Sequence, residues 1–411
     1  MRSGEAVVVT GIGPVTPVGI GVEDFWQGLV KGRSGARAIT DARVEGLTVR
    51  IGAPVDLAIG DHLDPEVSRR MDRVSHFAVV AAELARVDAA LGSGDVDPER
   101  LAVVMGSGVG GFATLESGFN TLHTKGPLRV RPDVIGLMVP NTAAGAVGML
   151  QGAFGPTECP ATACASGAHA IARGVSLLDA GHADVVIAGG AEAALTRAGL
   201  GAFAAGRTLS LRNDAPELAS RPFDVGRDGF VLAEGSTALI LEREGDARAR
   251  GARVYATIAG VGMSGDAFHF MAPQPEGEGA ERAMRFALRD AGLTPDDIAH
   301  VNVHATSTLM GDRAEARAVL RLFAGREVPV YAPKSALGHM IAAAGTSEVA
   351  ASILALRAGL LPATLNTEEQ EPEVAVNLAA SNTEVAEGGA ALSNSFGFGG
   401  TNAAVVVTVA A

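Results

Sequence analysis

The chain has 411 residues, of which 47% are hydrophobic and 19% charged, so it can form a large folded core and is not a disordered chain. Its net charge of −13 and the absence of a basic block argue against non-specific nucleic-acid binding. The two cysteines, Cys159 and Cys164, have neither the number of a disulfide framework nor the spacing of a zinc site.

No membrane or export segment is expected. The N-terminal stretch "MRSGEAVVVTGIG" reads as a strand and lacks the apolar length and cleavage region of a signal peptide. The most apolar stretch, 134–154, is interrupted by Pro140 and Asn141, which predicts a buried helix with its entry loop and not a membrane span. We therefore expect a cytoplasmic protein that does not bind membranes.

Short β-branched runs alternate with helical patterns along the chain, which is typical of a layered α/β fold. Several of the runs are apolar throughout, as in strands buried on both faces. The predicted strands are 6–11, 100–106, 184–190, 236–241, 252–263, 299–304 and 402–409. The clearest helical patterns are 74–90, 277–291, 313–323 and 346–358.

Two pairs of segments repeat. Residues 87–108 and 288–307 each read as a helix end, an Asp/Pro turn and a buried strand that ends at a small polar loop. The helical run after Cys164 and the run after His339 have similar lengths, and both end at a glycine. We expect two similar halves, 1–250 and 251–411, fused into one body.

Cys164 lies in "ATACASGAHAIARG", 161–174, where the following apolar residues have helical spacing. A thiol at a helix N-terminus is stabilised as the thiolate, so we expect its pKa to be lowered. The alternative, a buried structural thiol, stays open on this stretch alone.

His304 follows a predicted strand, and Lys334 and His339 flank a tight turn in "YAPKSALGHMIAAAG". One cysteine with two histidines suits a protease-like dyad, a metal site or an enzyme that forms carbon–carbon bonds. A zinc site would need a further ligand, and no spacing supports one. Two neutral imidazoles that donate to one carbonyl would stabilise an enolate. The segment "SNSFGFGGTN", 393–402, reads as a glycine-rich loop whose amides could supply half of an oxyanion hole.

Four motifs together resemble the elongating β-ketoacyl-[acyl-carrier-protein] synthases of the thiolase superfamily, over essentially the whole chain. They are "TACASGAHAIARG", "VNVHATSTLMGD", "KSALGHMIAAAG" and "NSFGFGGTN". The resemblance implies a thiolase-like αβαβα five-layer sandwich made of two similar halves. It implies an acyltransferase that condenses malonyl carrier protein with an acyl chain in fatty-acid elongation. No cofactor and no metal is implied.

The resemblance also implies the roles of individual residues. Cys164 would accept the acyl chain, His304 and His339 would serve decarboxylation and condensation, and Lys334 would tune the site. Phe398 would gate the site and share the oxyanion hole with the Cys164 amide. Substrate contacts would come from Thr306, Thr308, Phe203, Val109, Phe230 and Glu348, and carrier-protein contacts from Arg69, Arg70 and Arg207. Ala305 and Leu309 depart from the usual Gly and Pro of the family pattern.

The partners implied are an acyl carrier protein and a second copy of the chain, in a homodimer. A ketosynthase of a type II polyketide pathway is the near alternative. A non-catalytic partner of the chain-length-factor type would lack the nucleophile that Cys164 supplies. A degradative thiolase would carry a second catalytic cysteine, and no cysteine follows residue 164.

Overall fold

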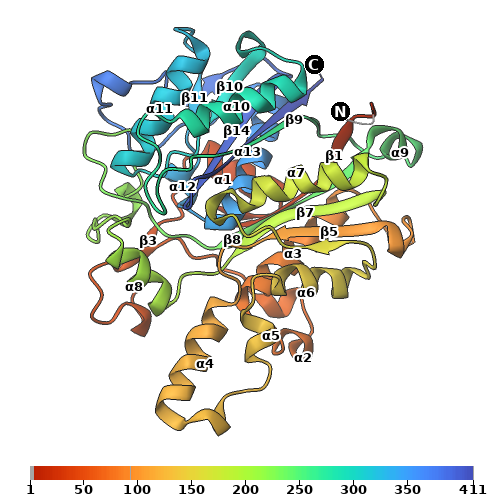
Figure 1. Ribbon diagram of the computed structural model, residues 1–411, viewed down its shortest axis with the longest axis vertical. Coiled ribbons are helices and arrows are strands. Elements are labelled where there is room, and N and C mark those ends of the chain that lie inside the picture. Colours follow the sequence, from red (N-terminus) through yellow and green to blue (C-terminus); the bar gives the residue numbers. More distant parts are fainter. Residues whose placement is uncertain (1–3, 93, 411) are drawn as a thin grey trace.

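Two sets of five strands pair edge to edge to form the main sheet of the computed structural model, which describes residues 4–92 and 94–410 (Figure 1). The first set is β1 (Val7–Thr16), β5 (Leu101–Gly106), β6 (Thr157–Glu158), β7 (Val185–Glu192) and β8 (Gly235–Arg243). The second set is β9 (Ala256–Gly265), β10 (Ile298–Asn302), β11 (Val330–Tyr331), β14 (Gly389–Gly397) and β15 (Thr401–Val409).

Both sets have the same strand order and direction. The order across the sheet is β11-β10-β14-β15-β9-β1-β8-β7-β5-β6, with β2 (Gly19–Ile20) paired to β1. Outward from the centre, the first, fifth, fourth, second and third strands of each set follow one another. The outer three strands of each set are parallel, and the remaining pairs are antiparallel. This repeated topology accounts for the pairs of similar segments found in the sequence.

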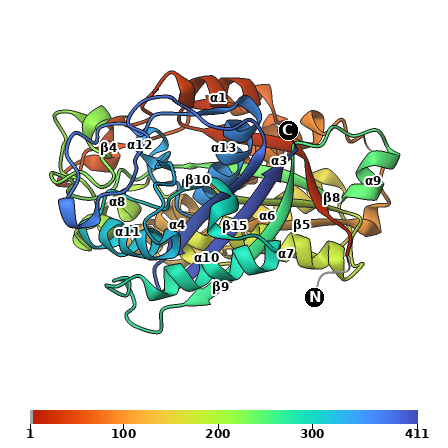
Figure 2. The ribbon, with the colours of Figure 1, turned by 90° about the horizontal axis from the view of Figure 1, so that it is seen from above.

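Helices form three layers around the two sets of strands. Outside the first set lie α3 (Arg73–Asp88) and α6 (Thr142–Gln151), and outside the second lies α10 (Glu278–Ala291), with α11 (Leu309–Phe323) packed on it. Between the sets, α7 (Ser166–Asp179) packs against α13 (Ala344–Ala358). Seen from above, helix α10 lies alongside strand β9 (Figure 2). The predicted αβαβα arrangement is therefore the observed one.

Paired glycines allow each outer helix to approach its strand closely. A Cβ on Gly13 would lie 2.0 Å from the carbonyl oxygen of Ala81 in α3, and one on Gly262 would lie 2.1 Å from that of Ala283 in α10. The motifs "GIG" in β1 and "GVG" in β9 thus occupy equivalent places in the two halves. Any side chain at these positions would force strand and helix apart.

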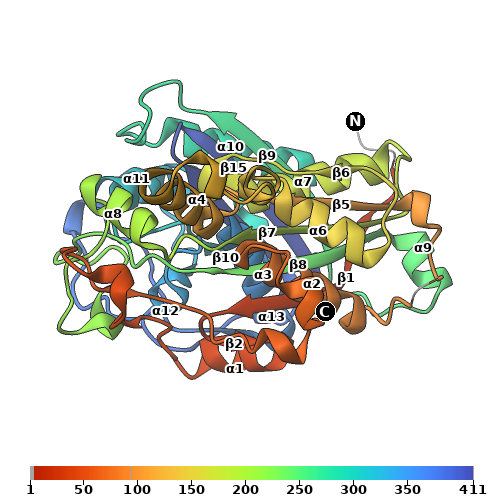
Figure 3. The same cartoon turned by 90° about the horizontal axis from the view of Figure 1, so that it is seen from below.

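The remaining helices are α1 (Val22–Val30), α2 (Pro65–Ser68), α4 (Phe112–Lys125), α5 (Val134–Met138), α8 (Arg197–Ala205), α9 (Glu244–Ala249) and α12 (Lys334–Leu337). The small ladders are β3 (Arg37–Ala38) with β4 (Ile51–Gly52), and β12 (Leu360–Leu361) with β13 (Thr383–Glu384). Helix α4 projects from the body below the sheet and faces the viewer in Figure 3.

All seven predicted strands are present, but two sequence interpretations were wrong. Residues 393–397 belong to strand β14, so only the turn at 398–400 is a loop. The segment 134–154 forms two helices, of which α5 has no buried residue. Within residues 4–92 and 94–410, the one segment with the length and hydropathy of a membrane span is instead Ile341–Ala358, and 89% of it is buried inside the protein. It is a core helix of this fold.

Candidate active site

Cys164 lies in a 3-10 turn, Ala163–Ala165, directly before α7. Ala163 has a positive φ of 50°, and Ser166 fastens the turn: its hydroxyl accepts from the Thr162 N–H and donates to the Ala163 carbonyl. The cysteine is 6% exposed. The predicted position at the helix start is therefore confirmed, and a tight, strained turn holds the thiol at the inner end of a cavity.

His339 reaches the thiol from the other half of the chain. It follows α12 and Gly338, whose positive φ of 71° disfavours any side chain and where a Cβ would lie 3.1 Å from those of Ala53 and Ala233. The backbone N–H of His339 donates to the Val231 carbonyl, and the His339 carbonyl accepts the Ala233 N–H. Its Nε2 lies 3.0 Å from the Cys164 sulfur.

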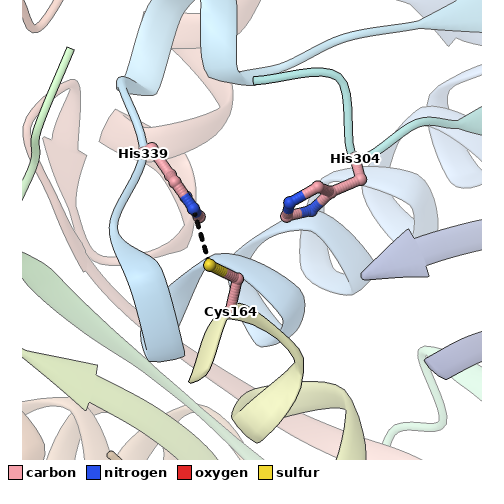
Figure 4. A group of neighbouring side chains, drawn as sticks. All are labelled: Cys164, His304 and His339. Carbon is pink, nitrogen blue, oxygen red and sulfur yellow. Dashed lines mark hydrogen bonds between the residues drawn. The ribbon is translucent and has the colours of Figure 1, made fainter. Parts of the chain in front are cut away.

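His304 completes the group from the end of β10. The carboxylate of Glu315 accepts the backbone N–H of His304 at 2.8 Å and that of Ala305 at 2.7 Å, and Asn394 donates to the same carboxylate. The two imidazole rings are 5.4 Å apart, edge to face. Both therefore present their edges to the space above the thiol (Figure 4).

The ligand atoms of Cys164, His304 and His339 lie within 4.8 Å of one another, which is close enough for them to share a metal ion. Two ligands on one tetrahedral zinc ion would be roughly 3.5 Å apart. The observed contact of 3.0 Å between Sγ and Nε2 is shorter and is a hydrogen bond. The geometry favours a thiol–imidazole pair over a metal ligand set.

The predicted lowering of the Cys164 pKa is wrong. Burial raises the pKa of this thiol to about 12, although the charge of Lys334 lowers it. Burial also holds the pKa of His304 and of His339 well below the usual value, again with a contribution from Lys334. Removal from water outweighs the favourable helix start, so the resting group is a neutral thiol between two neutral imidazoles.

Lys334 and Glu348 form a buried ion pair behind this group. Nζ of Lys334 lies 2.5 Å from Oε1 of Glu348, and both side chains are 1% exposed. Burial raises the pKa of Glu348 to about 7, and Lys334 counters that rise. The lysine thus brings one positive charge close to the thiol and both imidazoles.

The turn after β14 places Phe398 beside the thiol. The backbone N–H groups of Phe398 and of Cys164 itself both interact with the Cys164 sulfur and act to lower its pKa. A Cβ on Gly397 would lie 3.2 Å from the Cys164 nitrogen, so only glycine lets the two backbones come this close. Two amides therefore converge at the thiol.

A cavity of about 490 Å³ leads to the thiol. Four of the six predicted substrate contacts line it: Thr306, Thr308, Phe203 and Phe230. Arg207, predicted to contact the carrier protein, lines it as well. Phe203 and Phe230 stack edge to face at 5.6 Å, and Phe230 stacks on His339 at 5.1 Å. Val109, Glu348 and Lys334 do not line the cavity: Glu348 and Lys334 are fully buried, and Val109 is half-buried.

The buried side chain of Arg227 forms hydrogen bonds to the loop that carries Thr306 and Thr308. This side chain is fully buried and donates to the carbonyls of Thr308 and Leu309 at 3.2 and 3.1 Å. Ser307 has a positive φ of 70°, and its N–H donates to the carboxylate of Asp312. These contacts fix the loop in which the family's Gly and Pro are replaced.

The three predicted docking arginines do not form one cluster within a single chain. Arg207 is exposed just after α8, where it lines the cavity. Arg69 and Arg70 are exposed between α2 and α3. Helices α2 and α8 lie apart in Figures 1 and 3.

Sequence reasoning missed several residues of the site. Ile341, Phe396, His269, Met271 and Met310 line the cavity, and Glu315 holds the His304 backbone. Glu315 lies eleven residues after His304, on the helix that follows the loop, which is the one signal that could have revealed it. The segment around His269 and Met271 has neither helix nor strand periodicity.

The comparisons with known proteins match most of the chain to one family. The family described as "Beta-ketoacyl synthase, N-terminal domain" matches residues 4–247, and the corresponding C-terminal domain matches 255–368. The chain is 41% identical to 3-oxoacyl-[acyl-carrier-protein] synthase 2 of Synechocystis sp., over 96% of each chain. It is 42% identical to the synthase of the same name from Rhizobium meliloti, over 98% of each.

Solved structures show the same fold. A beta-ketoacyl synthase from Burkholderia phymatum superimposes with a TM-score of 0.93 and 33% identity, over 99% of this chain and 100% of that one. A chain from a type II polyketide acyl-carrier protein in complex with its ketosynthase superimposes with a TM-score of 0.90, at 29% identity and the same coverage.

Proposed function

This chain belongs to the β-ketoacyl synthase family and is a 3-oxoacyl-[acyl-carrier-protein] synthase of fatty-acid elongation, and we propose that Cys164, His304 and His339 carry out its reaction. The single observation that supports these roles is the neutral thiol between two neutral imidazoles, beneath two convergent amides. A hydrolase triad would need an orienting acid on one histidine instead.

In the first step the Cys164 sulfur attacks the carbonyl carbon of an acyl thioester on the carrier protein. The thiol proton passes to Nε2 of His339, its nearest acceptor, and then to the sulfur of the released carrier arm. The carbonyl oxygen becomes negative in the tetrahedral intermediate and is stabilised by the N–H groups of Cys164 and Phe398. The acyl chain is then held as a thioester on the enzyme.

In the second step malonyl carrier protein occupies the same cavity. His304 and His339, the latter now in the tautomer with its proton on Nε2, donate to its thioester carbonyl, and the bond to the carboxylate breaks with release of carbon dioxide. The electron pair left on the carbon forms the new bond to the acyl carbonyl, and Cys164 leaves as a thiolate that takes up a proton from solvent. Neutral imidazoles suit this step because a charged one would cost more to bury than a neutral donor.

Substitutions separate the two steps. Cys164→Ala is expected to abolish acyl-enzyme formation and condensation, whereas Cys164→Gln should still release carbon dioxide from malonyl carrier protein. His304→Ala should lose the decarboxylation as well. Cys159→Ala is the matched control, since this thiol lies outside the cavity and bonds to the Pro140 carbonyl. Condensation retained in Cys164→Ala would disprove the assignment.

The carrier protein is proposed to dock at the cavity mouth through Arg207, with Arg69 and Arg70 as a second basic site. Acidic carrier helices would be attracted to these exposed guanidinium groups even though the chain is acidic as a whole. Arg207→Glu should raise KM for acyl carrier protein substrates and leave kcat for a soluble pantetheine thioester unchanged. An equal rise in KM for both substrates would show that Arg207 contacts the pantetheine arm and not the carrier protein.

We further propose a homodimer formed through the edge of the sheet at β6. An edge strand has unpaired backbone groups, and the neighbouring Met149 and Phe154 are 69% and 76% exposed. Leu128 and Ile135, near α4 and α5, are exposed as well. A second copy would cover this apolar surface and continue the sheet.

Light scattering tests this interface. Phe154→Glu is expected to yield monomers, while Leu320→Glu, on α11, which lies apart from β6 in Figure 3, should remain dimeric. A dimer that persists in Phe154→Glu would place the interface elsewhere. A cytoplasmic location and a division of the halves near residue 250 complete the proposal.

A further inference from the structure

Glu192 is a buried carboxylate that the condensation scheme does not use. It is the last residue of β7 and is fully shielded from water. Its Oε2 accepts the Gly108 N–H at 2.9 Å, and the N–H groups of Val109 and Ala342 also bond to the carboxylate. One side chain therefore joins the turn after β5 to the turn that precedes α13.

The second of these turns forms part of the cavity wall. Ile341 lines the cavity two residues after His339 and has a φ of 47°, which is unusual for a β-branched residue. On one side, a Cβ on Gly108 would lie 3.2 Å from Ile341 Cγ2. On the other, a Cβ on Gly190 would lie 2.2 Å from the Ala342 carbonyl oxygen. Packing and the carboxylate together hold Ile341 in this conformation.

The charge of Glu192 also reaches both cysteines. It raises the pKa of Cys164 and of Cys159, in each case in addition to burial. The other charged or titratable groups close to the Cys164 thiol are His304, His339 and Lys334. The two thiols therefore report on the position and charge of Glu192.

We propose that Glu192 is a positioning residue whose carboxylate fixes Ile341 as the cavity wall and so determines which acyl chains Cys164 accepts. The inference rests on the proposed function, because it takes the cavity as the site of the acyl chain. A carboxylate suits the role because it only accepts hydrogen bonds, and three backbone N–H groups point at it. A glutamine would turn its own NH₂ group toward those donors and loosen the turn.

Two substitutions disturb the wall in different ways. Glu192→Gln removes acceptor capacity and lets Ile341 relax, which should widen the cavity. Gly108→Ala adds a methyl group that would lie 2.8 Å from the carboxylate and 3.2 Å from Ile341, which should push the wall inward. Glu242→Gln is the matched control: this glutamate is also buried, but it pairs with Arg250 and lies outside the cavity.

The main readout is kcat/KM for condensation with short, medium and long acyl carrier thioesters. Glu192→Gln should change the ratio of long to short chains by at least about threefold in favour of long ones, and Gly108→Ala should change it in the opposite direction. Glu242→Gln should leave the ratio unchanged. An unchanged ratio in folded Glu192→Gln overturns the inference, and if that variant does not fold, the ratio in Gly108→Ala decides.

Thiol alkylation gives a readout that does not depend on condensation. At about pH 9 the carboxylate of Glu192, with its pKa of about 7, is ionised. Removal of this negative charge in Glu192→Gln should speed iodoacetamide modification of Cys164 and of Cys159 by about threefold to tenfold, measured by peptide mass. Unchanged rates at both thiols would refute the placement of Glu192. A wild-type enzyme that does not condense would instead refute the proposed function.

Discussion

Removal of Lys334 should destabilise the protein and impair the site by separate physical routes. Lys334→Met leaves Glu348 buried without its partner, because both side chains are only 1% exposed. Breaking a buried ion pair from one side costs about 3–5 kcal/mol of unfolding free energy. The double substitution Lys334→Met with Glu348→Gln removes both charges and should recover most of this loss.

The loss of unfolding free energy in Lys334→Met should also depend on pH in a defined direction. Burial raises the folded-state pKa of Glu348 from 4.5 to about 7, so the group favours folding in its protonated form. A raised pKa gives stability that is present at low pH and is lost as pH rises through the folded value. Without Lys334, that pKa should rise further. Lys334→Met should therefore be least destabilised near pH 5 and most destabilised near pH 8, where Glu348 would otherwise be ionised.

Guanidinium denaturation at both pH values, combined with a condensation assay, tests this reasoning. The double variant should be stable but should still condense slowly, because it lacks the charge that lowers the pKa of Cys164, His304 and His339. Equal stability of the single and double variants would refute the ion-pair argument. Full condensation activity in the double variant would refute the electrostatic role of Lys334.

Three further predictions concern the thiol, the arm-binding loop and the helix contacts. In the free enzyme, the rate of Cys164 alkylation should rise about tenfold per pH unit from pH 7 to 9, because its pKa is about 12, and a plateau in that range would indicate a thiolate–imidazolium pair. Arg227→Met should raise KM for carrier-linked substrates more than it lowers kcat, because it removes the hydrogen bond that fixes the loop at Thr308. An unchanged KM would show that the loop keeps its conformation without Arg227. Gly262→Ala should lower the free energy of unfolding by about 1–3 kcal/mol, because its methyl group meets α10. Chemical denaturation of the variant measures this loss. A smaller loss would show that strand β9 and helix α10 can move apart at little cost.

The fold could be predicted largely from local patterns. Strands such as β5 and β7 are apolar on both faces, and the repeated helix–turn–strand segments by themselves indicated two similar halves. Strand β14 was missed because "SNSFGFG" is rich in glycine and polar residues, which are typical of a turn. Its neighbours on both sides, β10 and β15, supply the pairing that makes it a strand.

The three residues that the structure brings together, Cys164, His304 and His339, could be picked out from the sequence, but the burial that sets their pKa values could not. Cys164, His304 and His339 each stand in a small-residue loop next to a strand or helix, and motif resemblance assigned them roles. The sequence alone suggested a lowered thiol pKa, because a helix start is a local feature. Only the folded chain shows that the thiol is removed from water, and this burial outweighs the helix start.

Short segments of the chain were enough to predict the class of fold and to single out Cys164, His304 and His339, since these depend on periodicity and on motifs. Which distant groups meet depends on the folded chain. Glu192 accepts the Ala342 N–H, Arg227 donates to the Thr308 carbonyl, and helix α2, next to Arg69, lies apart from helix α8, next to Arg207. Such contacts join residues far apart in the chain, and no local pattern encodes the packing of two half-sheets that brings them together or keeps them apart.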